Sequence, residues 1–76
     1  MVTPPTNQTI AERVRAAMVE ANESEVTLAD ATDIPRTTLR RRLGGNSDWL
    51  TGELTAITSH LGIPLVELLA DEPSVA

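Results

Sequence analysis

Glycine and proline residues divide this sequence into pieces that have the length of short helices. "DIP" at 33–35 and "GIP" at 62–64 each contain a proline, which lacks the backbone N–H that a continuing helix needs. Gly44 and Gly45 lie between them and are typical of a helix C-terminus. The pieces between these breaks carry apolar residues at helical spacing, without the alternation of a strand. The sequence therefore predicts a compact all-α bundle of about five short helices.

The residues at the ends of the pieces indicate where the helices begin. Thr9 and Glu12 match a capping box for a first helix at about 9–22. Ser24 can cap a second helix at about 25–32, and Pro64 stands at a favoured first position of the fifth. The third runs from about 36 to 43, and the fourth is the regular apolar series from Leu50 to Leu61. The side chains expected to point inward are Ile10, Val14, Ala17, Met18, Ala21, Val26, Leu28, Ala29, Leu39, Leu43, Leu50, Leu54, Ile57, Leu61, Leu65, Leu68 and Leu69.

Composition limits the setting in which this domain works. The chain has no cysteine, which excludes disulfides and thiolate metal sites and fits a reducing compartment. No apolar run approaches the roughly 20 residues of a membrane helix. We expect a soluble domain of the cytoplasm, without membrane contact, that spans residues 9–70. Residues 1–8 are expected to form a flexible arm and residues 71–76 a flexible tail.

Positive charge is concentrated in one segment of an acidic chain. The net charge is −5, yet residues 36–42 hold four of the six basic residues and none of the eleven acidic ones. At 100° per residue, Leu39 and Leu43 lie about 40° apart and point into the core. The opposite half of the third helix then carries the exposed side chains Arg36, Thr37, Arg40 and Arg41, flanked by Thr38 and Arg42.

Two interpretations of this arginine cluster remain open at this point. A guanidinium fork can bind a phosphate or the O6/N7 edge of guanine with two hydrogen bonds, so the helix could bind nucleic acid. Alternatively, it is a solvated basic face, paired with acidic residues of the first two helices. No Asp or Glu lies four residues away within the helix itself to relieve the repulsion between the arginines.

The segment "EVTLADATDIPRTTLRRRLGG" at 25–45 resembles the helix-turn-helix of lambda-repressor-like DNA-binding domains. The pattern of the family is an Ala in the first helix, a small or left-handed residue in the turn, and two aliphatic residues after it, and Ala29, Asp33, Ile34 and Leu39 stand at these positions. Three residues depart from it: Asp33 replaces the usual Gly, Pro35 a capping Ser or Thr, and Arg42 a hydrophobic residue. The similarity continues through "DWLTGELTAITSHLGIPLVELL" and covers about 9–70, so it implies the five-helix fold of that family.

The resemblance also implies a mode of binding. The second helix of the motif is expected to enter the major groove of double-stranded DNA. The resemblance places Arg36, Thr37, Arg40 and Arg41 at base edges, and Thr38, Arg42, Asn46 and Ser47 at phosphates. Glu25 stands where many relatives carry a Gln that touches phosphate, and a carboxylate there is expected to lose that contact.

The function expected from these features is that of a sequence-specific transcription regulator, a small phage-type repressor or Cro-like protein. It would act in the cytoplasm of the bacterial host if a phage encodes it. One short helix makes few contacts, so we expect a homodimer on an operator with two half-sites. One alternative is a protein-interaction module, such as an antirepressor, that binds its partner through the exposed arginines of the third helix. The other is an accessory factor of phage recombination.

The remaining polar residues do not suggest catalysis. No nucleophile has a recognisable base, no glycine-rich phosphate loop occurs, and His60 has no second His or Cys with which to hold a metal. We therefore expect no enzyme, no cofactor and no metal site. His60 is interpreted as a solvated residue at a helix end, and Trp49 as a residue that fastens its loop to the core. Arg13 and Arg15 are expected on the surface.

Overall fold

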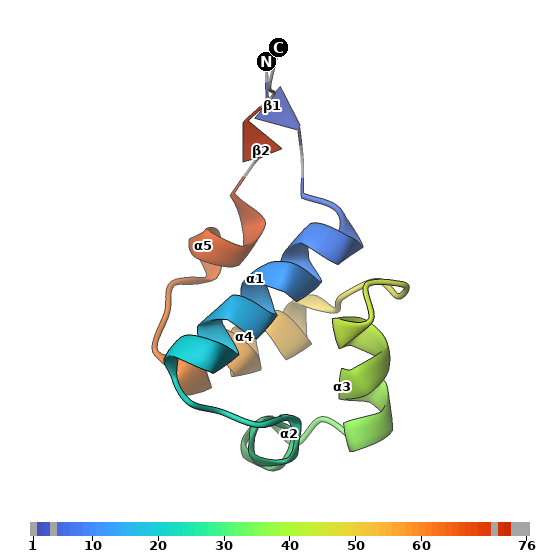
Figure 1. Cartoon of the computed structure of the whole chain (residues 1–76), viewed down its shortest axis with the longest axis vertical. Coiled ribbons are helices and arrows are strands. Elements are labelled where there is room, and N and C mark those ends of the chain that lie inside the picture. The colour runs from blue at the N-terminus through green and yellow to red at the C-terminus, as the bar shows by residue number, and fades with distance from the viewer. Residues whose placement is uncertain (1, 4, 71, 74–76) are drawn as a thin grey trace.

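Five helices follow one another in the computed structural model, which describes residues 2–3, 5–70 and 72–73 (Figure 1). They are α1 (Asn7–Glu20), α2 (Glu25–Thr32), α3 (Arg36–Leu43), α4 (Thr51–Leu61) and α5 (Leu65–Leu69). The all-α fold class predicted from the sequence is confirmed.

The start of α2 and the turn between α2 and α3 have the local structure that the sequence predicts. Ser24 accepts a hydrogen bond from the N–H of Thr27, and the Thr27 hydroxyl accepts one from the N–H of Ser24. Asp33 ends α2 in the left-handed conformation, with φ of 60°. Pro35, with ψ of 139°, is the residue directly before α3. The two helices therefore begin and end as predicted.

The starts of the other three helices differ from the prediction, and for α4 the difference is that Leu50 is the N-cap residue and the helix begins at Thr51. Thr6, and not Thr9, caps α1, because Thr6 is extended and its hydroxyl accepts the N–H of Thr9 at 3.1 Å. The helix therefore starts at Asn7. Pro64 was predicted as the first residue of α5, but it is extended as well, with ψ of 141°, and the helix begins one residue later.

The core lies where the apolar faces of all five helices meet. Its buried members are Ile10, Val14, Met18, Leu28, Ala29, Ile34, Leu39, Leu43, Leu54, Ile57 and Leu68. Four side chains predicted to be inward are exposed instead: Ala21, Val26, Leu50 and Leu69. Ala21 and Leu50 lie just outside α1 and α4, as C-cap and N-cap residues, where the helical periodicity that predicted their direction does not apply.

A short antiparallel ribbon joins the two ends of the chain. Strand β1 (Val2–Thr3) pairs with β2 (Glu72–Pro73), in the register Val2 to Pro73 and Thr3 to Glu72. The ribbon lies at the end of the molecule beyond α1 and α5 (Figure 1). The sequence shows no strand pattern at these positions, and the ribbon falls within the segments expected to form an arm and a tail. The parts of the predicted arm and tail at 1, 4, 71 and 74–76 lie outside the described residues.

Arg13 fastens α5 to α1. Its Nη1 atom donates to the carbonyl oxygens of Leu68 and Ala70 at 3.1 and 2.7 Å, and to that of Glu67 at 3.5 Å. The last carbonyls of a helix have no partner within it, so this cation satisfies groups that would otherwise need water. Arg13 is therefore committed to the fold, whereas the sequence suggested a surface residue.

His60 and Glu23 connect the end of α4 to the loop between α1 and α2. The His60 Nε2 and Glu23 Oε2 atoms are 2.9 Å apart. Interaction with the Thr27 side chain, and after it the hydrogen bond with His60, holds the pKa of Glu23 below its ordinary value. The interpretation of His60 as a solvated residue thus misses a contact between segments that are far apart in the sequence.

Replacing Arg13 tests its role in holding α5. We expect Arg13→Met, which keeps the apolar stem, to lower the free energy of unfolding by about 1–2 kcal/mol, because the carbonyls of α5 lose a charged donor. Urea denaturation followed by far-ultraviolet circular dichroism measures this change. The control is Arg15→Met, an exposed arginine of the same helix, with an expected change under about 0.5 kcal/mol. Equal effects of the two variants would contradict the assignment.

The lowered pKa of Glu23 predicts a pH dependence. A carboxylate with a lower pKa in the folded state than in the unfolded state adds stability above its unfolded pKa, and this stability is lost as the pH falls through the folded value. We expect the melting temperature of the wild type to exceed that of Glu23→Gln at about pH 5, and the difference to vanish at lower pH. A difference that does not change with pH would show that Glu23 does not contribute through its charge.

Candidate functional site: the arginine face of α3

The two leucines of α3 determine which of its residues reach the surface. Leu39 and Leu43 are 0% and 4% exposed, within the core between α1 and α2. The helix therefore turns its other side outward, and Arg36, Thr37, Arg40 and Arg41 are all exposed, as the spacing predicts. We call these four residues the arginine face.

Arg42 is engaged in the fold. Its Nε and Nη2 atoms donate to the two carboxylate oxygens of Glu53 on α4, at 2.9 and 3.4 Å. The two side chains are only 15% and 12% exposed. Glu53 also accepts the N–H of Leu50 at 3.1 Å, so the same carboxylate caps α4. The guanidinium that was predicted to contact phosphate thus joins the end of α3 to the start of α4.

Arg40 has a looser partner. Its Nε atom lies 3.5 Å from Oε1 of Glu25, the first residue of α2. The side chains are 81% and 46% exposed, and ion pairs in such a setting contribute little to stability. Pairing with an acidic residue of α2 is what the second interpretation of the cluster expected. Here it involves one arginine and leaves most of its surface in solvent.

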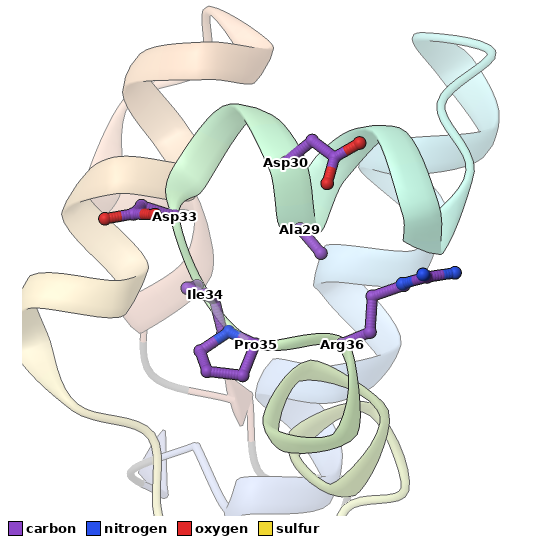
Figure 2. A pocket seen from close by; sticks show the side chains of 6 residues that line it. All are labelled: Ala29, Asp30, Asp33, Ile34, Pro35 and Arg36. Carbon is purple, nitrogen blue, oxygen red and sulfur yellow. The ribbon is translucent and has the colours of Figure 1, made fainter.

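Arg36 borders an open hollow at the turn between α2 and α3. The hollow measures about 280 Å³ and is lined by Ala29, Asp30, Asp33, Ile34, Pro35 and Arg36. Figure 2 shows the Arg36 guanidinium and the Asp33 carboxylate on opposite sides of it. Within the described residues, Arg36 and Arg41 make no ion pair, so their guanidinium groups are available to an anion.

The loop after α3 holds the other predicted phosphate contacts. Asn46 is exposed there, whereas Ser47 of the loop and Thr38 of α3 are half-buried. Asn7 of α1 donates to Asp48 at 2.8 Å and keeps this loop near the start of α1. Asn46 is therefore the most accessible of the three polar side chains, and their contacts with phosphate stay a prediction.

Trp49 fastens the same loop to the core, as the sequence predicts. It packs against the buried cluster, and its indole Nε1 is buried without a hydrogen-bond partner in the described part of the chain.

Gly45 lies in the same loop with φ of 81°, and a Cβ atom there would come within 3.2 Å of the Gln8 Cα. The loop and the first turn of α1 are thus closely packed beside α3.

Among the described residues, the groups best placed to bind a ligand are the exposed arginines of α3. Among the residues that the structure describes, no three histidine, cysteine or carboxylate side chains lie together as a metal ion would require. None of the helices described for this chain combines the length and the apolar composition that a membrane crossing requires. The arginine face, in contrast, offers forked donors that suit a phosphate or a carboxylate.

Comparison with known proteins bears on the fold. No protein-family model and no curated protein matches the sequence. Among solved structures, the chain is similar to Streptomyces albus HEPD with substrate 2-hydroxyethylphosphonate (2-HEP) and Fe(II) bound. The TM-score is 0.77 at 20% sequence identity, over 100% of this chain and 16% of that one. The chain thus spans about a sixth of the length of the protein that it resembles, and at this identity the likeness shows the fold.

This likeness corrects two expectations from the sequence. The chain was expected to be a sequence-specific regulator of transcription, with a protein-interaction module or a recombination factor as alternatives, and not an enzyme. Its fold instead recurs as a part of HEPD, an enzyme whose solved structure holds a substrate and Fe(II). The sequence could not indicate this likeness to part of an enzyme, because the arginine cluster and the turn before α3 are local features and carry no information about the proteins in which the fold recurs.

The pair of Arg42 and Glu53 gives a test of which arginines belong to the fold. We expect Arg42→Met to lower the free energy of unfolding by about 1–3 kcal/mol, because it leaves a half-buried carboxylate without its cation. The neighbouring exposed Arg41→Met is the control, with a change under about 0.5 kcal/mol. Urea denaturation measures both. A larger loss from the Arg41 variant would overturn the distinction.

Proposed function

We propose that this chain is an auxiliary domain that works with an enzyme and holds a phosphate-bearing partner against α3. One observation carries the proposal: Arg36, Arg40 and Arg41 are exposed together on one helix, although the chain has a net charge of −5. Such a concentration of charge directs a polyanion to this face, because the rest of the chain is acidic and repels it.

The association with an enzyme is supported by the likeness in fold. In the solved structure, this fold makes up 16% of a longer chain that binds 2-hydroxyethylphosphonate and Fe(II). A domain of this size beside a larger catalytic part can bind the partner while the chemistry takes place elsewhere. The arginine face is suited to that task, since it offers charged donors on a rigid helix.

Duplex DNA, bound through its backbone phosphates, is the partner that we propose. Arg36 and Arg40 are one helical turn apart, a rise of about 6 Å, so both can contact phosphates of one backbone. The resemblance to lambda-repressor-like domains supports the same partner. Contacts to phosphate do not depend on base sequence, and a second copy of the chain on the same duplex would double their number. The cytoplasm, where DNA is accessible, is the proposed location.

Titration with duplex DNA at increasing salt tests this proposal. Because each phosphate contact releases counterions, we expect a slope of log K against log salt of about −0.9 per contact. The double variant Arg36→Ala, Arg41→Ala is expected to bind more weakly and to reduce the slope by nearly 2. Fluorescence anisotropy of a labelled duplex, from about 50 to 200 mM salt, measures both.

The control for this titration is Arg15→Ala, which removes one positive charge from the exposed surface of α1. It is expected to leave the slope nearly unchanged, because Arg15 lies outside the arginine face. Binding that does not depend on salt, or a loss with Arg15→Ala as large as that from either single alanine variant at Arg36 or Arg41, would refute the proposal.

A further inference from the structure

We infer that Glu25 is an internal competitor for Arg40 and limits how tightly the arginine face binds phosphate. The inference rests on the proposed function, since it concerns the same face. Glu25 is the first residue of α2, and its Oε1 atom lies 3.5 Å from the Arg40 Nε. A carboxylate in this place pairs with the Nε side of the guanidinium, which an incoming phosphate would also use.

The exposure of the two side chains makes this pair replaceable. Arg40 is 81% exposed and Glu25 is 46% exposed, so water and ligands reach both. The pair of Arg42 and Glu53 differs, because its side chains are 15% and 12% exposed and the carboxylate also caps α4. A phosphate can therefore displace Glu25 from Arg40, while Arg42 stays engaged in the fold.

The position of Glu25 decides which ligands gain from such an exchange. A ligand that contacts Arg40 alone replaces one anion by another and gains little. A ligand that also reaches Arg36 and Arg41, for which the described residues provide no ion pair, makes contacts that outweigh the loss. Glu25 thus favours a row of phosphates over an isolated one.

Replacing Glu25 by glutamine tests the inference, because the side chain keeps its shape and loses its charge. We expect Glu25→Gln to bind a duplex about two- to fivefold more tightly than the wild type, the range that corresponds to an exposed ion pair. In an Arg40→Gln background the same substitution is expected to have a much smaller effect. Fluorescence anisotropy at constant salt gives the four affinities, and thermal unfolding checks that each variant is folded.

The matched control is Glu67→Gln, an exposed glutamate on α5, which packs against α1 and α4. It changes the net charge equally and is expected to alter affinity by less than about twofold. If the wild type binds DNA and Glu25→Gln gains no more than Glu67→Gln, the inference is wrong and the proposed function stands. If no variant binds DNA in a salt-dependent manner, both are wrong.

Discussion

Burial of Leu39 and Leu43 is the constraint on which the surface of this protein depends. Both leucines lie in the core, so only the opposite side of α3 faces solvent. The outward direction of its arginines therefore follows from core packing. The cost of exposing two leucines is about 3–6 kcal/mol, far more than repulsion between neighbouring cations on a helix. Core packing therefore keeps together positive charges that would separate in an unfolded chain.

Carboxylates from other helices then divide the arginines into separate roles. Glu53 takes Arg42 into a half-buried pair that connects α3 to α4, and Glu25 holds Arg40 loosely at the surface. Arg13, which the sequence does not distinguish from other surface arginines, binds the carbonyls at the end of α5. Arginines in this chain thus connect two helices, remain available to a ligand or cap a helix, depending on which groups of other helices lie next to them.

The fold was predictable because its signals are local. Ser24, Asp33 and Pro35 act on their own neighbours in the chain, and α2 and α3 begin and end where these residues predict. Several of the errors occur where the chain is extended. Leu50 and Pro64 precede their helices, and the pairing of β1 with β2 joins residues about seventy positions apart without any alternation in sequence.

The sequence by itself determined the five helices, their order and the rotation of α3, because capping, breaking and apolar spacing act within a few residues. Only the tertiary structure decided which cations remain available, since Glu25 and Glu53 approach α3 from other helices and nothing in local spacing encodes that approach. It also showed that this fold occurs within an enzyme. Shape is retained at 20% identity because many apolar combinations fill one core.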